Sequence, residues 1–166
     1  SKEELFIEDL MRMLDNTLTK FVKGAPLTMK KAITSAESER SVGLGAMGFH
    51  SYLQRNGMAL NSPMAMGPNV KIFKYIKKKC DAASLKLGKE RGEAPDLKGT
   101  GKRFAHMTAI APNASSSIIC GNTSPSIEPL RANAFSQKTL SGSFLIKNKY
   151  LEELLEKKGK NTKDVW

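Results

Sequence analysis

Hydrophobic residues recur at helical spacing through the first third of the chain. Between residues 3 and 22 they fall at steps of three and four, which predicts an amphipathic helix. A shorter helix is expected over 28–37, with Thr28 as its N-cap. A third helix is predicted over 44–55, and the pair Asn56-Gly57 marks its C-terminal end.

The longest predicted helix has lysines on the face opposite its apolar residues. After a loop over 61–69, Asn69 is expected to cap this helix, and Gly88, Gly92 and Pro95 break its pattern. Its apolar positions again follow at steps of three and four, and they are Val70, Phe73, Ile76, Cys80, Ala83 and Leu87.

The second half of the chain alternates between extended and helical patterns. A buried strand is predicted over 104–111, followed by a polar loop and a short helix around 118–120. Two further extended segments, 132–137 and 141–146, precede a helix over 149–158, which Gly159 is expected to end. The predicted fold class is therefore α/β and helix-rich.

The net charge of the chain indicates which kinds of binding partner it favours. The 166 residues carry 27 Lys and Arg against 16 Asp and Glu, a net charge of +11. Eleven basic and four acidic side chains lie in the window 70–103, so most of the excess is found there, and it favours anionic partners. One alternative is a small basic nucleic-acid-binding protein that uses the Lys71–Lys79 helix face. The same lysines also fit the solvated face of a helix, and aromatic residues for base stacking are scarce nearby.

The lengths of the apolar runs and the number and spacing of the cysteines indicate which cellular compartments and which metal sites are disfavoured for this chain. No apolar run reaches the roughly 18 residues of a membrane span, and no signal-peptide pattern opens the chain, so we expect no membrane partner. Cys80 and Cys120 are too few for a disulfide framework, which favours a reducing, cytoplasmic setting. Together with His50 and His106 they lack the spacing of a zinc site, so no metal site is predicted. We expect both thiols to be packed rather than reactive.

The run Gly43–Gly48 has the spacing G-x-G-x-x-G of a dinucleotide-binding loop. That function needs a strand before the glycines, but the preceding residues 34–41 are polar. No acidic residue lies between Arg40 and Asp81 to hold a ribose. We therefore interpret the glycines as positions where a helix packs closely against a neighbour.

The candidate site is the turn after the predicted strand. Pro112 fixes where the strand ends, and Asn113, Ala114, Ser115 and Ser116 lead into a short helix. The first amides of a helix have no intrahelical acceptor, so such a turn can bind an anion, and small side chains let a phosphate approach. The same pattern also fits an ordinary serine-capped helix, and the local residues alone do not choose between the two. Since the glycine and lysine spacing of a Walker motif is missing, a nucleoside triphosphatase is disfavoured.

Three motifs resemble the large, catalytic subunit of class I ribonucleoside-diphosphate reductase. They are the run Ala109–Asn122, then Ser126-Ile127-Glu128-Pro129, then Leu140–Phe144. Upstream, the runs Arg40–Phe49 and Lys89–Gly92 resemble the same family. The resemblance therefore covers nearly the whole chain in the family's order, and it is closest to phage or phage-like bacterial versions.

This resemblance implies a fold and a substrate site. The fold would be part of the ten-stranded α/β barrel that holds the substrate, with 1–166 as a single segment of that catalytic barrel domain. The substrate phosphate-binding loop would consist of Pro112, Asn113, Ala114, Ser115 and Ser116, whose amides and hydroxyls would bind the diphosphate of a ribonucleotide. The glycines at 43–48 would then serve the close packing of a barrel helix.

The resemblance also implies which chemistry lies outside this chain. The family's radical cysteine would precede Ser1 and its relay tyrosines would follow Trp166, so both ends are expected to be internal to a longer protein. Neither Cys80 nor Cys120 matches a redox cysteine; no catalytic residue is assigned, and the segment alone is expected to be inactive. The parent enzyme would use a radical-bearing small subunit with a metal cofactor, a dithiol reductant, and ATP or deoxynucleotide effectors. Its partners would be a ribonucleoside diphosphate and the rest of the large subunit, and nucleic acid is not expected.

Overall fold

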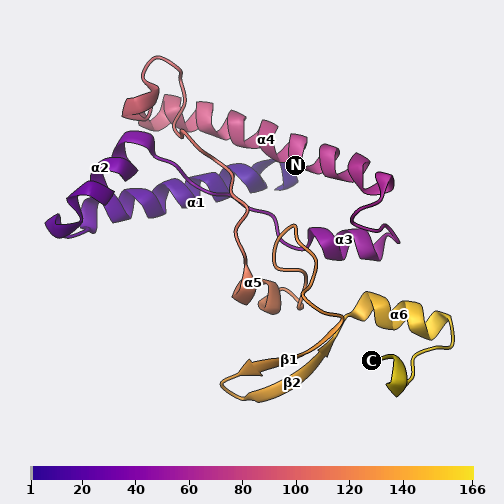
Figure 1. Ribbon diagram of the computed structural model, residues 1–166. Coiled ribbons are helices and arrows are strands. Elements are labelled where there is room, and N and C mark those ends of the chain that lie inside the picture. The colour runs from indigo at the N-terminus through magenta and orange to yellow at the C-terminus, as the bar shows by residue number, and fades with distance from the viewer. Residues whose placement is uncertain (1) are drawn as a thin grey trace. The chain divides into compact units, whose positions relative to one another are not determined.

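The computed structural model describes residues 2–166 (Figure 1). Its helices are α1 (Lys2–Gly24), α2 (Lys30–Glu39), α3 (Phe49–Arg55), α4 (Pro63–Arg91), α5 (Ala114–Ile119) and α6 (Lys149–Lys157), and its strands are β1 (Ala134–Thr139) and β2 (Gly142–Lys147). Short 3-10 turns occur at Leu27–Met29, Pro95–Leu97 and Lys163–Val165. The chain divides into a first unit, which contains the residues up to Gly45 and Met66–Ala111, and a second unit, Ala46–Ala65 and Pro112–Trp166. Within residues 2–166, no helix combines the length and the apolar character that crossing a membrane requires.

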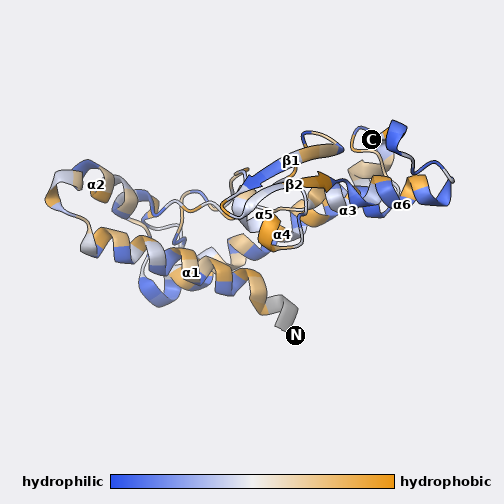
Figure 2. Ribbon diagram, turned by 90° about the horizontal axis from the view of Figure 1, so that it is seen from below, coloured by the Kyte–Doolittle hydropathy of each residue, from blue (hydrophilic) through white to orange (hydrophobic). Residues whose placement is uncertain are grey.

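The first unit is built on the apolar faces of α1 and α4. Polar and apolar bands alternate along α1 (Figure 2), as the predicted amphipathic helix requires. Side chains of the two helices meet Phe104, which follows α4, in one core, whose buried members are Ile7, Met11, Cys80, Ala83, Leu87 and Phe104. The prediction that Cys80 is a packed core residue is confirmed.

A buried ion cluster joins several elements of the first unit. Asp15 of α1 is fully buried, and its carboxylate accepts hydrogen bonds from Arg40 at 2.6 Å, Arg91 at 2.7 Å and Arg103 at 3.0 Å. Burial acts to raise the pKa of Asp15, but the hydrogen bonds from the three arginines outweigh it, so the pKa lies below its usual value. Short-range sequence patterns do not reveal this cluster, because its members lie as far as 88 positions apart.

Two predicted helix starts are wrong. Asn69 does not cap the longest helix, because α4 already begins at Pro63 and includes Pro68. Proline suits the first helical position, since the N–H that it lacks would have no intrahelical acceptor there. Thr28 does not cap a helix either: it lies in a 3-10 turn, and α2 begins at Lys30 without a side-chain cap.

The glycine run Gly43–Gly48 is not helical, which corrects the prediction of a helix over 44–55. Leu44 instead forms a parallel bridge with Thr108. A Cβ atom added at Gly45 would lie 2.8 Å from the carbonyl oxygen of Ala109, closer than real side chains approach. Glycine is therefore needed for close packing, as predicted, but between two extended segments rather than at a helix.

The predicted buried strand over 104–111 is formed only in part. Phe104 is fully buried, whereas Thr108–Ala111 are exposed. Among the described residues this segment forms one bridge, with Leu44, so its other edge has no paired strand. A strand that is buried on both faces normally lies inside a larger sheet. Residues 2–166 give a helix-rich fold with one two-stranded sheet, and do not reach the ten strands of the expected barrel.

The second unit contains α3, α5, α6 and a β-hairpin (Figure 1). Strands β1 and β2 are antiparallel, with Ala134 opposite Lys147, and each begins one or two residues later than predicted. Asn148 caps α6, because its side-chain oxygen accepts from the amide of Tyr150. Gly159 follows α6 with a φ of +63°, so the predicted glycine stop is confirmed.

Candidate functional site

The five predicted loop residues lie at the start of α5, in the second unit. Pro112 is exposed, Asn113 occupies the N-cap position and Ala114 is the first helical residue. Ser115 and Ser116 therefore belong to the first turn of the helix. The predicted short helix begins earlier than expected, because the serines form part of it rather than of the loop.

Three consecutive amides at the start of α5 donate no hydrogen bond within residues 2–166. The Asn113 amide donates to the carbonyl oxygen of Pro125 at 3.0 Å, and the Ser117 amide donates to that of Asn113 at 2.8 Å. Between them, the amides of Ala114, Ser115 and Ser116 donate no hydrogen bond to another residue in the part of the chain that the structure describes. All three residues are exposed, so these donors are open to an external anion.

The serine side chains of the turn divide into two kinds. Ser117 is 4% exposed, and its hydroxyl donates to the carbonyl oxygen of Ala114 at 2.9 Å, within the turn. The side chains of Ser115 and Ser116 are exposed, and within residues 2–166 they form no side-chain hydrogen bond. Two hydroxyls are thus available beside the three open amides, while the third stabilises the turn.

A cavity of about 360 Å³ lies elsewhere in the second unit. It is lined by Ser51 of α3, by residues after α5, by the hairpin and by the start of α6, including Asn122, Phe135 and Tyr150. The segment Pro112–Ser116 is not part of its lining. The candidate loop therefore lies on the exposed surface of its unit, and the cavity is a separate feature.

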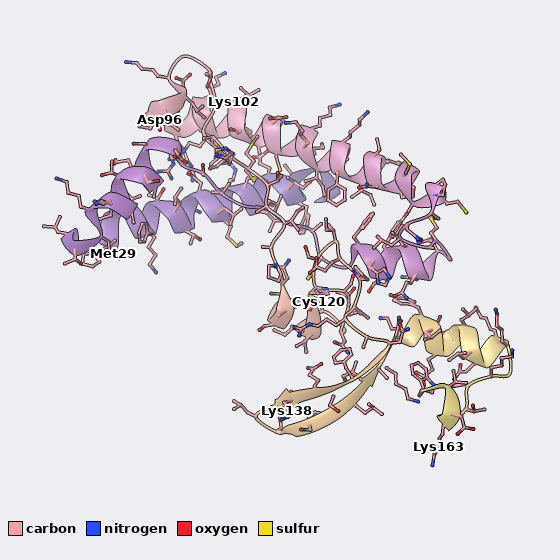
Figure 3. All side chains as sticks on the ribbon, viewed as in Figure 1. Met29, Asp96, Lys102, Cys120, Lys138 and Lys163 are labelled. Atoms are coloured by element: carbon pink, nitrogen blue, oxygen red, sulfur yellow. The ribbon has the colours of Figure 1, made fainter. Side chains whose placement is uncertain are left out.

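The two thiols differ in exposure. Cys80 is fully buried, and burial raises the pKa of its thiol, as does the nearby carboxylate of Asp81. Cys120 directly follows α5 and is exposed (Figure 3), so the prediction that it is packed is wrong. Within residues 2–166, no three His, Cys, Asp or Glu side chains gather as a metal site would require.

The lysine face of α4 is exposed but partly neutralised. Lys77 pairs with Asp81 at 3.0 Å, and Lys86 pairs with Glu8 at 2.8 Å. Lys78 is exposed, and within the described residues it forms no ion pair. This face therefore has the charge that the nucleic-acid alternative requires.

Comparison with known proteins places the chain in a class. The model of the ribonucleotide reductase barrel domain matches residues 4–100 and 94–165. These ranges include both the candidate loop and the glycine run, and they leave only a few terminal residues unmatched. The chain therefore belongs to the ribonucleotide reductase family, as part of its barrel domain.

Several individual relatives are named as ribonucleotide reductase subunits, and each is much longer than this chain. The ribonucleoside-diphosphate reductase large subunits of Invertebrate iridescent virus 3 and virus 6 are 56% and 50% identical over 155 and 165 residues, which is 93% and 98% of this chain. Those matches cover 25% and 17% of the viral subunits, so the chain spans a quarter of their length or less. The class Id ribonucleotide reductase alpha subunit of Actinobacillus ureae matches with a TM-score of 0.82 at 38% identity, covering 96% of this chain and 29% of that one. The resemblance to the large subunit of this family, predicted from the sequence motifs, is confirmed, and the viral relatives named here are iridescent viruses rather than phages.

Proposed function

We propose that this chain forms part of an enzyme that reduces ribonucleoside diphosphates to deoxyribonucleoside diphosphates, and that Pro112–Ser116 binds the substrate's phosphates. The observation that carries the proposal is the set of open amides at Ala114, Ser115 and Ser116. It coincides with the motif through which the sequence resembles the large subunit of this enzyme family.

The physical support is the match between these donors and a phosphate group. Backbone amides that point outward can donate to phosphate oxygens, and hydrogen bonds to an anion are stronger than those between neutral groups. The hydroxyls of Ser115 and Ser116 add two donors, and their small size leaves the amides accessible. A diphosphate held in this way would fix the position of the ribose, which lowers the entropic part of a reaction barrier.

The radical and redox chemistry of the reaction is assigned to the rest of the enzyme. The parent enzyme would supply a radical-bearing small subunit with its metal cofactor, a dithiol reductant, and nucleotide effectors. Cys80 does not suit thiol exchange, because it is buried and its pKa is raised. In this proposal the chain's own residues bind and orient the substrate, and they do not react with it.

The proposal is tested in a large subunit that carries this segment, for example the virus 3 subunit with the matching 155 residues replaced by this chain. Ser115→Asp and Ser116→Asp place a negative charge beside the open amides, and we expect each to weaken ribonucleoside diphosphate binding about tenfold or more. Ser35→Asp is the matched control, since Ser35 is an exposed residue of α2 in the first unit. Titration with a ribonucleoside diphosphate gives the dissociation constants, and equal affinity for all three variants and the parent protein would refute the loop assignment.

A further inference from the structure

We infer that Ser51 and Ser124 position the phosphate loop by locking it to α3, an inference that rests on the proposed function. Both residues lie in the second unit and neither belongs to the loop itself. Ser51 is 3% exposed and Ser124 has no exposed surface. Their role follows from a pair of hydrogen bonds and from the contacts that lead from this pair to the loop.

The two serines bind each other reciprocally. The Ser124 amide donates to the Ser51 hydroxyl at 2.9 Å, and the Ser51 amide donates to the Ser124 hydroxyl at 3.2 Å. The Gly48 amide also donates to the carbonyl oxygen of Ser124 at 2.8 Å. Three hydrogen bonds therefore hold Ser124 against the first turn of α3.

The neighbours of Ser124 in turn hold both ends of the open turn. The next residue, Pro125, accepts from the Asn113 amide at 3.0 Å, just before the open amides. The preceding residue, Thr123, donates its amide to the carbonyl oxygen of Ser117 at 3.1 Å, just after them. A shift of Ser124 would therefore move the donors of Ala114–Ser116 relative to a bound phosphate.

A third buried serine offers a matched comparison. Ser126 is 1% exposed, but its hydroxyl has no hydrogen-bond partner in the described part of the chain. Its backbone carbonyl accepts from the Phe49 amide at 3.3 Å, a contact that does not depend on the side chain. Removing the Ser126 hydroxyl therefore changes the volume of a buried site without breaking a hydrogen bond to α3.

The test compares Ser51→Ala, Ser124→Ala and Ser126→Ala in the large subunit that carries this segment. For Ser124→Ala we expect the KM for a ribonucleoside diphosphate to rise about tenfold, because the phosphate donors are misplaced. The affinity for the unphosphorylated ribonucleoside should stay within about twofold, and Ser51→Ala should behave in the same way. Ser126→Ala should leave the KM unchanged.

A purely structural role would give a different kinetic result. If Ser124→Ala only unfolded part of the protein, kcat would fall with the active fraction while KM stayed constant, which would overturn the inference. Ser124→Cys keeps a small side chain with a weak acceptor, so an intermediate KM is expected even if Ser124→Ala folds poorly. Equal KM values for Ser124→Cys and the parent protein, together with equal values for Ser51→Ala, would also overturn it.

The two proposals fail in distinguishable ways. If Ser115→Asp and Ser116→Asp weaken diphosphate binding while Ser51→Ala and Ser124→Ala match Ser126→Ala, the loop assignment stands and the positioning role is wrong. If Ser115→Asp and Ser116→Asp leave binding unchanged, the proposed function itself is wrong.

Discussion

Arg40 and Asp15 form a buried ion pair in which the guanidinium nitrogen and the carboxylate oxygen lie 2.6 Å apart. The Asp15 side chain has no exposed surface and that of Arg40 is 8% exposed. Arg91 and Arg103 bind the same carboxylate, so one aspartate of α1 connects the end of α2, the end of α4 and the segment after it. In the first unit, these three ion pairs therefore hold together segments that lie far apart in the sequence.

Replacing Asp15 by Asn should destabilise the chain by about 3 kcal/mol or more, because it leaves three guanidinium groups with a neutral partner in a buried site. Asp9→Asn is the control, since Asp9 is exposed on the same helix, and its effect should stay within about 0.5 kcal/mol. Urea unfolding followed by circular dichroism measures both changes. Similar losses for Asp15→Asn and Asp9→Asn would show that the cluster contributes little.

The same carboxylate predicts the response of stability to acid. The pKa of Asp15 is lowered in the folded chain, so its contribution is fully present above the unfolded value of about 3.9 and is lost as the pH falls through the folded pKa. The difference in unfolding free energy between the parent chain and Asp15→Asn should therefore be constant near pH 7 and shrink below about pH 4. Urea titrations at a series of pH values test this, and a difference that grew on acidification would contradict it.

Gly88 of α4 and Gly24 at the end of α1 should respond differently to alanine. A Cβ atom at Gly88 would collide with the backbone carbonyl of Gly101, whereas at Gly24 the neighbouring elements leave open space for a Cβ atom. We expect Gly88→Ala to destabilise the chain by about 1–3 kcal/mol, and Gly24→Ala to change its stability by no more than about 0.5 kcal/mol. Thermal unfolding of both variants gives the sign, and a stabilised Gly88→Ala would show that the contact is loose.

The thiols of Cys80 and Cys120 should react at different rates, because only Cys120 is accessible to solvent. Cys120 is exposed and should react at once with a disulfide reagent such as dithionitrobenzoate, while buried Cys80 should react only after unfolding. The Cys120→Ser variant should therefore show no fast phase under native conditions, and one reactive thiol in denaturant. A fast phase that survived in Cys120→Ser would show that Cys80 is reached by solvent.

The lysine face of α4 should bind DNA weakly and without a preferred sequence. Exposed lysines give an electrostatic attraction that falls steeply with salt, so we expect binding seen at about 50 mM salt to be largely lost at about 200 mM. The variant Lys71→Glu/Lys74→Glu/Lys78→Glu should abolish the residual binding. Fluorescence anisotropy with duplex and single-stranded DNA measures it, and tight binding at the higher salt would favour the nucleic-acid alternative.

Local periodicity predicted the elements whose partners are close in sequence. The α1 pattern, the glycine stop at Gly159 and the two strands of the hairpin were found because short-range spacing and turn residues determine them. The helix predicted across Gly43–Gly48 failed because Leu44 and Met47 have helical spacing, while the real partner of this segment, around Thr108, lies far along the chain. Pairing between segments that are far apart in the sequence produces no periodic pattern of hydrophobic residues from which it could be predicted.

The sequence motif indicates the candidate loop, but it does not indicate the buried serines that hold the loop in place. Small polar residues after a strand indicate where an anion could bind, and they do not reveal which amides stay open. The contact between Ser51 and Ser124 spans 73 positions, and nothing in the sequence distinguishes these serines from Ser126, whose hydroxyl forms no hydrogen bond within residues 2–166. Burial and hydrogen-bond direction, which only the fold provides, make that distinction.

Each compact unit takes its residues from two separate stretches, and the chain passes from one unit to the other after Gly45, after Ala65 and after Ala111. A single proteolytic cut therefore cannot release either unit whole. A fragment that begins at Pro112 would lack α3, which supplies Gly48 and Ser51 to hold Ser124. Any exchange of the candidate loop Pro112–Ser116 between related chains must carry Ala46–Ala65 along with it, although those residues are encoded well upstream.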